Sequence, residues 1–155
     1  MLKSKTNKKL NILCPEPQNF STSGLELFAK NSNLFAHKMT QKQFEKKSIN
    51  YDILLIRLER EVNSYIINNS KYLKAIISPT TGIDHIDVTE AKNKNINIIC
   101  LKGESKFLRT IPSTAEHTWA LLLSLIRNIN QSFIDVKKYN WRRDIYRGTE
   151  LKDKN

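Results

Sequence analysis

The chain has 155 residues, of which 39% are hydrophobic and 26% are charged, as is typical of one domain with a hydrophobic core. No segment approaches the roughly 18 consecutive apolar residues of a membrane helix, and no signal-type apolar core follows the basic N-terminus, so we expect a cytoplasmic protein with no membrane partner. The formal net charge of +11 lies mostly at the two ends, because residues 11–136 hold fifteen basic and twelve acidic side chains; this distribution argues against nucleic acid as a partner.

The two cysteines do not form a metal or redox pattern. Cys14 and Cys100 are far apart, and neither has the close Cys or His spacing of a zinc site or the partner of a Cys-x-x-Cys pair. No metal ligand is therefore assigned, and both residues are interpreted as reduced, small hydrophobic side chains.

Short apolar runs alternate with helix-like segments along the first hundred residues. Strands are predicted at residues 10–14, 34–36, 51–58, 73–77 and 96–101, and helices around residues 25–29, 41–47, 62–67 and 88–94. The run 53–56 is apolar throughout, as in a strand covered on both faces. Because parallel neighbours need crossover helices, the alternation predicts an α/β fold: a flavodoxin-like parallel sheet of about five strands with flanking helices.

The last predicted element is a single long helix. Residues 113–139 contain no Pro or Gly, and Ser113 or Thr114 with Glu116 is a plausible start signal. Between residues 119 and 126 only Ser124 is polar, so the apolar surface runs around the whole circumference. A single small sheet covers only one side of such a helix, and we therefore expect another domain, another subunit or both to cover the rest.

Three segments, in order, resemble those of NAD-dependent D-2-hydroxyacid dehydrogenases. Residues 52–57 resemble a strand of that family, residues 73–88 (LKAIISPTTGIDHIDV) resemble its strand, loop and helix, and residues 114–128 (TAEHTWALLLSLIRN) resemble its interdomain helix. The GxDxID motif alone is weak, but the ordered set is strong and extends from about residue 10 to the end. The resemblance implies hydride transfer between NAD, or NADP, and a small 2-hydroxy or 2-oxo acid, in an enzyme that forms a homodimer.

The end of the chain resembles the family's connector to its cofactor domain. The resemblance divides the chain into a basic leader (1–9), a substrate-binding domain (10–111), an interdomain helix (112–140) and a connector (141–155) to an absent NAD-binding domain. The four glycines, Gly24, Gly82, Gly103 and Gly148, are too far apart for a Gly-x-Gly-x-x-Gly turn. The family's catalytic Arg, Glu and His belong to the missing half, so no catalytic residue is assigned, Glu116 and His117 included, and we expect no turnover by this chain alone.

The resemblance places substrate binding in the loop after residue 77. There the backbone N–H groups of Thr80, Thr81 and Gly82 are predicted to bind the substrate carboxylate, with Gly82 permitting the turn. In the alternative, Gly82 only turns the chain and Pro79 stiffens it. Ser78 stands where phosphoglycerate-using relatives often carry an arginine, which speaks against a phosphorylated substrate.

Two further residues complete the predicted site. Arg57 is expected either to reach an anionic substrate group or to form a surface salt bridge with Glu59 or Glu61. Thr114 is predicted to touch the nicotinamide end of the cofactor through its backbone.

Two other classes of function share features with this sequence. The chain could be a non-catalytic interaction module that dimerises through apolar residues of the long helix, namely Trp119, Leu122, Ile126, Ile129 and Phe133. A receiver-like signalling domain shares the alternating fold, but it needs a cluster of acidic residues after the first strand and an aspartate after the third. This chain has Pro15-Glu16-Pro17 and Arg57-Leu58-Glu59 at those positions.

Overall fold

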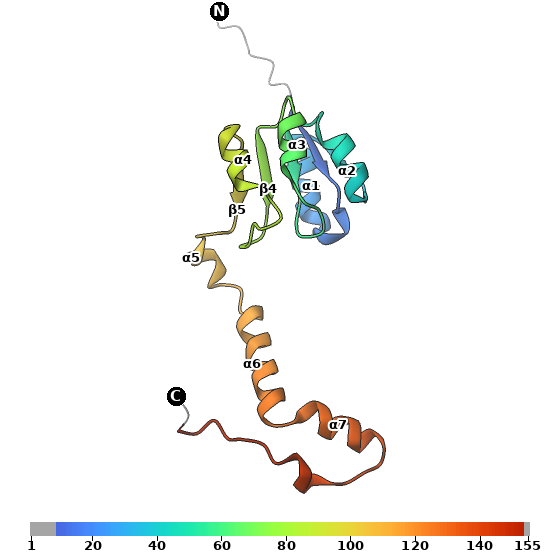
Figure 1. Ribbon diagram of the computed structural model, residues 1–155, viewed down its shortest axis with the longest axis vertical. Coiled ribbons are helices and arrows are strands. Elements are labelled where there is room, and N and C mark those ends of the chain that lie inside the picture. The colour runs from blue at the N-terminus through green and yellow to red at the C-terminus, as the bar shows by residue number, and fades with distance from the viewer. Residues whose placement is uncertain (1–8, 154–155) are drawn as a thin grey trace, which may run out of the picture. The chain divides into compact units, whose positions relative to one another are not determined.

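The computed structural model describes residues 9–153, which divide after Glu104 into two compact units. The first unit is built on a parallel five-stranded sheet with the order β2-β1-β3-β4-β5 (Figure 1). Its strands are β1 (Asn11–Cys14), β2 (Asn33–Ala36), β3 (Ile53–Leu55), β4 (Ala75–Ser78) and β5 (Asn97–Cys100). This strand order is that of flavodoxin-like folds, so the predicted fold class is confirmed.

Helices follow the strands in the predicted alternation. They are α1 (Thr22–Asn31), preceded by the short 3₁₀ helix η1 (Pro17–Asn19), then α2 (Gln41–Ser48), α3 (Ser64–Asn69) and α4 (Val88–Asn93). Thr40 begins α2 with a capping box shared with Gln43, and the Asn63 and Asp87 side chains accept hydrogen bonds from the first turns of α3 and α4. Because these caps satisfy backbone N–H groups that have no partner within the helix, they fix where each helix begins.

The sheet packs against helices on both faces, because successive side chains of a strand point in opposite directions. On one face, Leu13, Leu54 and Ile76 join the core cluster that contains residues of α2, α3 and α4: Phe44, Ile66, Ile67 and Ala91. On the other face, Ile12, Cys14 and Leu55 pack with Leu25 and Phe28 of α1. The continuous apolar runs of the strands are therefore explained by burial on both sides.

The second unit contains α5 (Ser105–Leu108), α6 (Ser113–Ile126), α7 (Ile129–Lys137) and the 3₁₀ helix η2 (Arg143–Tyr146). The prediction of one helix over residues 113–139 is wrong, because Asn128 adopts a left-handed backbone with φ of 52° between α6 and α7. Asparagine tolerates this conformation better than most residues, and its side-chain amide donates a hydrogen bond to the Arg147 carbonyl. The start at Ser113 is confirmed, but Pro112 occupies the N-cap position and no side chain caps the helix.

A returning segment holds the junction between α6 and α7. The Thr149 N–H donates to the Ile126 carbonyl over 2.8 Å, next to Gly148. A Cβ atom at Gly148 would lie 2.5 Å from the Ile126 carbonyl oxygen and 2.8 Å from Arg127 Cα, so only glycine fits at this position. These contacts favour the break after Ile126. They come from residues outside the predicted helix, so the pattern of residues 113–139 does not predict the break.

Candidate functional site

The loop after β4 lies at the carboxyl edge of the sheet, the edge at which parallel α/β sheets usually bind ligands. Ser78 is fully buried at the end of the strand, and its Oγ lies 2.9 Å from Thr80 Oγ1 and 3.1 Å from His85 Nε2. Thr80 Oγ1 donates its proton to the Gly82 carbonyl over 2.7 Å, so the Ser78 hydroxyl must donate to Thr80. His85 then donates to Ser78 through Nε2–H.

This chain of hydrogen bonds fixes the shape of the loop. The N–H of Thr80 donates to the Ser78 carbonyl over 2.7 Å, and the Thr80 carbonyl accepts from Leu101 over 2.9 Å. The Thr80 amide is thus engaged within the loop, whereas the exposed Thr81 and Gly82 amides donate to no acceptor among residues 9–153. Of the three predicted amides, two are free to receive an anion and the third is part of the support.

Gly82 does not have the role predicted for it in the turn. Among the described glycines only Gly103 has a positive φ, and a Cβ atom at Gly82 would make an ordinary contact of 3.6 Å with Asp84 Oδ2. The prediction that the turn needs the conformational freedom of Gly82 is therefore wrong.

Arg57 follows β3 and stands level with the beginning of this loop. Leu55 pairs with Ile77 in the sheet, so Arg57 and Pro79, each two residues further along, lie at the same height. Both line a surface pocket of about 410 Å³, whose other walls include Phe20 and Phe28. The structure thus brings Arg57 and the loop after β4 to one edge of the sheet.

The Arg57 guanidinium forms a hydrogen bond and no salt bridge within the described chain. Its Nη1 donates to the Asn19 carbonyl over 3.0 Å, and the expected alternative of an ion pair with Glu59 or Glu61 is not formed. Glu59 instead contacts Arg60, with a nitrogen to oxygen distance of 3.6 Å. The charge of Arg57 is therefore not cancelled by a neighbouring carboxylate.

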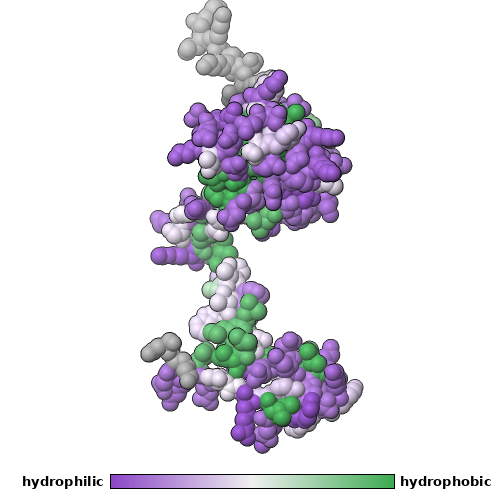
Figure 2. All heavy atoms as spheres, viewed as in Figure 1, coloured by the Kyte–Doolittle hydropathy of each residue, from purple (hydrophilic) through white to green (hydrophobic). Residues whose placement is uncertain are grey.

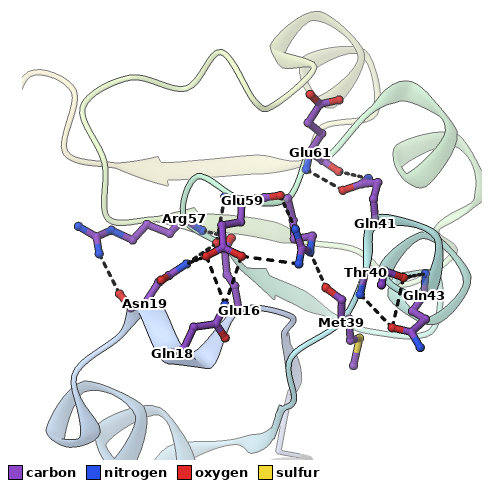
Figure 3. Close-up of polar contacts among 11 residues, drawn as sticks. Glu16, Gln18, Asn19, Met39, Thr40, Gln41, Gln43, Arg57, Glu59 and Glu61 are labelled. Carbon is purple, nitrogen blue, oxygen red and sulfur yellow. Dashed lines mark hydrogen bonds and ion pairs between the residues drawn. The ribbon is translucent and has the colours of Figure 1, made fainter.

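Glu16 is a residue of this edge that the sequence did not single out as a ligand-side residue. It follows β1, its side chain is fully buried, and its carboxylate accepts hydrogen bonds from the Arg57 N–H, the Glu59 N–H and the Asn19 side-chain amide over 2.6, 3.0 and 3.0 Å (Figure 3). The only sequence signal is an acidic residue between two prolines directly after a buried strand. Two of its three partners, Arg57 and Glu59, are about forty positions away, so the sequence pattern does not reveal them.

Burial lowers the pKa of His85, and the opposing effects of Glu16, Asp84 and Glu61 are smaller. The imidazole is therefore neutral at pH 7, which agrees with a single Nε2–H donated to Ser78. His85 thus has a local hydrogen-bonding role, whereas His37 and His117 are exposed.

Cys14 is buried, and desolvation raises the pKa of its thiol to about 11. It is thus protonated at neutral pH, as the interpretation of a small hydrophobic residue requires. Among residues 9–153, no three His, Cys, Asp or Glu side chains are placed to hold a metal ion. In the same part of the chain, no helix is both long and apolar enough to span a bilayer.

Thr114 belongs to the second unit, not to the one that holds the loop. It lies in the exposed first turn of α6, where its carbonyl accepts a hydrogen bond from Thr118 Oγ1 over 2.8 Å. Further along α6 the apolar side chains remain exposed, with Trp119 at 55% and Leu125 at 75% of their maximal accessible surface (Figure 2).

Comparison with known proteins gives the same assignment as the motifs. The model of the D-isomer specific 2-hydroxyacid dehydrogenase catalytic domain matches residues 15–140. D-3-phosphoglycerate dehydrogenase of Bacillus subtilis is 36% identical over 101 residues, covering 65% of this chain and 18% of that protein. Hydroxypyruvate reductase of Thermotoga maritima is 31% identical over 119 residues, covering 74% of this chain and 37% of that protein.

The fold is shared with solved structures of the same kind. The D-lactate dehydrogenase of Aquifex aeolicus, solved with NAD and lactic acid, superimposes with a TM-score of 0.71 at 22% identity, over 91% of this chain and 41% of that one. The chain thus spans less than half the length of these proteins. With its model match over most of the residues, the chain belongs to the D-isomer specific 2-hydroxyacid dehydrogenase family.

Proposed function

We propose that this chain supplies the substrate-binding part of a dehydrogenase that interconverts small 2-hydroxy and 2-oxo acids, with the N–H groups of Thr81 and Gly82 as receptors for the substrate carboxylate. The observation that carries the proposal is a pair of amides, on exposed residues, that have no acceptor in the described part of the chain and belong to a loop braced by hydrogen bonds of Thr80 at the ligand edge of a parallel sheet. Successive backbone N–H groups bind anions well, because their dipoles point at the charge and need no reorganisation.

Arg57 supplies the positive charge for the same acid. It stands level with Pro79, which follows the neighbouring strand, and forms no ion pair with any residue from 9 to 153, so its guanidinium is available to a carboxylate. To do so, the side chain exchanges one hydrogen bond to the Asn19 carbonyl for a stronger charged one.

The proposed substrate carries no phosphate. Where phosphoglycerate-using relatives often carry an arginine, this chain has Ser78, whose hydroxyl forms hydrogen bonds with Thr80 and His85. The next cation after β3, Arg60, donates to the Met39 and Glu59 carbonyls and contacts the Glu59 carboxylate. Arg57 is thus the one arginine of this edge without a carboxylate partner among the described residues, which suits a singly charged acid.

The described residues do not fit a dinucleotide. The turn after β1, where nucleotide-binding folds hold a pyrophosphate on glycine N–H groups, contains Pro15-Glu16-Pro17 with a buried carboxylate that repels phosphate. We propose that NAD or NADP is bound mainly by a further domain, with the Thr114 backbone close to its nicotinamide end. On this proposal the isolated chain performs no hydride transfer, and NAD-dependent oxidation of a 2-hydroxy acid by the pure chain would contradict it.

Binding of the acid is tested by NMR titration of the ¹⁵N-labelled chain with pyruvate and glyoxylate. We expect saturable shifts at the Thr81 and Gly82 amides, a weaker affinity in Arg57→Gln, and an unchanged affinity in Thr81→Ala, which keeps the amide and loses only an exposed side chain. 3-Phosphoglycerate is expected to bind no better than pyruvate. Shifts spread over the surface, with none at these two amides, would overturn the assignment.

A second candidate, a non-catalytic module that self-associates, is favoured by one observation. Large apolar side chains of α6 and α7 are exposed, among them Trp119, Leu122 and Phe133. Exposed apolar surface of this extent marks an interaction site. A homodimer through these helices is compatible both with the proposed dehydrogenase and with a non-catalytic module. Light scattering checks this: we expect a dimer, and a monodisperse monomer that binds no hydrophobic dye excludes self-association.

A further inference from the structure

The most unusual buried group of the first unit is the Glu16 carboxylate. Its side chain has no accessible surface, and none of the ion pairs among residues 9–153 includes it. A buried carboxylate without a cation is costly unless hydrogen bonds satisfy it. Here two backbone N–H groups and one side-chain amide do so, at the distances given above.

The two backbone donors belong to the segment that leaves the sheet after β3. Strand pairing ends when the Ile56 N–H donates to the Ile77 carbonyl. The next backbone donors, Arg57 and Glu59, both turn to Glu16 instead of to a neighbouring strand. The Glu16 carboxylate therefore accepts the backbone hydrogen bonds that follow the end of the strand pairing, and these bonds hold the backbone of Arg57 in place.

The side chain of Arg57 is held by the same turn. Its guanidinium donates to the Asn19 carbonyl, and the Asn19 amide donates to Glu16 Oε2, while the Asn19 N–H donates to the Glu16 carbonyl. Both ends of Arg57 thus rest on one short segment, residues 16–19 (Figure 3). Glu16 thus holds the backbone of Arg57 directly and its guanidinium through Asn19.

We propose that Glu16 is a positioning residue that sets the backbone and the guanidinium of Arg57 for the incoming acid; its link to substrate binding rests on the function proposed above. Glu16 does not touch the acid itself. It acts through hydrogen bonds, because its carboxylate accepts one from each of the three donors at the same time. A glutamine in its place would point its own NH₂ group at one of those donors.

The test compares Glu16→Gln with a control, Glu61→Gln. Glu61 follows β3 like Arg57, and its exposed carboxylate accepts no hydrogen bond among the described residues. With pyruvate as the probe, we expect Glu16→Gln to raise the Kd about tenfold, the size of one lost charged hydrogen bond, and Glu61→Gln to leave it unchanged. In a double-mutant cycle, Glu16→Gln added to Arg57→Gln should raise the Kd no further, because Glu16 acts through Arg57. An unchanged Kd in Glu16→Gln, or additive losses, would overturn the proposal.

A measurement without ligand separates this proposal from the proposed function. In the free chain, Glu16→Gln should speed hydrogen exchange at the Arg57 and Glu59 amides and increase the motion of the Arg57 Nε–Hε group, with the amides of the sheet core unchanged. If pyruvate does not bind even the unmodified chain, the proposed function fails and these signals still decide the role of Glu16. Should Glu16→Gln not fold, Asn19→Ala removes one of the three donors and is expected to give a smaller change of the same kind; the absence of that change refutes the proposal.

Discussion

The support of the loop after β4 by one hydroxyl group leads to a sharp prediction. In Thr80→Val the side chain keeps its shape but loses the hydrogen bonds of 2.7 Å to the Gly82 carbonyl and 2.9 Å to Ser78 Oγ. Each hydrogen bond contributes about 1 kcal/mol. Water can reach the exposed Gly82 carbonyl, but the buried Ser78 hydroxyl still accepts from His85 and loses the acceptor of its own proton, so the loss of unfolding free energy should be about 1–3 kcal/mol.

The same substitution should also weaken binding of the acid. Without the hydroxyl, the Thr81 and Gly82 amides are no longer held in one arrangement, and the acid must order them when it binds. We expect the Kd for pyruvate to rise about three- to tenfold, which corresponds to roughly 1 kcal/mol.

The assay combines urea unfolding, followed through amides of β3 and β4 so that only the first unit is observed, with the NMR titration. Thr81→Val is the matched control, because its exposed side chain makes no hydrogen bond in the described chain and should change stability by less than about 0.5 kcal/mol. If Thr80→Val and Thr81→Val are indistinguishable in both measurements, the hydroxyl does not support the loop and the reasoning is refuted.

Three more predictions concern stability. Phe44→Ala empties a fully buried position of the core and should cost about 3–5 kcal/mol in urea unfolding; a loss below 1 kcal/mol would mean that α2 is not packed on the sheet. Gly148→Ala should destabilise the second unit, because the new Cβ would meet the Ile126 carbonyl oxygen at 2.5 Å, and a thermal scan that matches the unmodified chain would contradict this. Hydrogen bonds from the Arg142 side chain lower the pKa of Asp135 from 3.8 to about 2, so this carboxylate favours the folded state above pH 3.8 and the benefit disappears as the pH falls towards 2. An acid titration of Asp135→Asn should lack that component, and an unchanged acid transition would show that the pair with Arg142 does not contribute.

Much of the site followed from local pattern. The apolar runs and the turn residues after residue 77 were enough to predict the loop and its position at the sheet edge, whereas a role of Arg57 in binding was implied by the family resemblance and stays a prediction. The roles of individual atoms were not predictable. Whether the Thr80 amide is free depends on its contact with the Ser78 carbonyl, and whether Arg57 is paired depends on Asn19, 38 positions away.

The sequence by itself determined the class of fold, because strands that are buried on both faces need continuous apolar runs and parallel neighbours need helices between them. Only the tertiary structure decided that Glu16 is buried and that α6 ends at Ile126. Glu16 depends on donors from the segment after β3, and the break at Asn128 depends on the returning chain at Gly148 and Thr149. In both cases the deciding interaction joins residues distant in sequence, and its strength depends on geometry that exists only after the chain has folded.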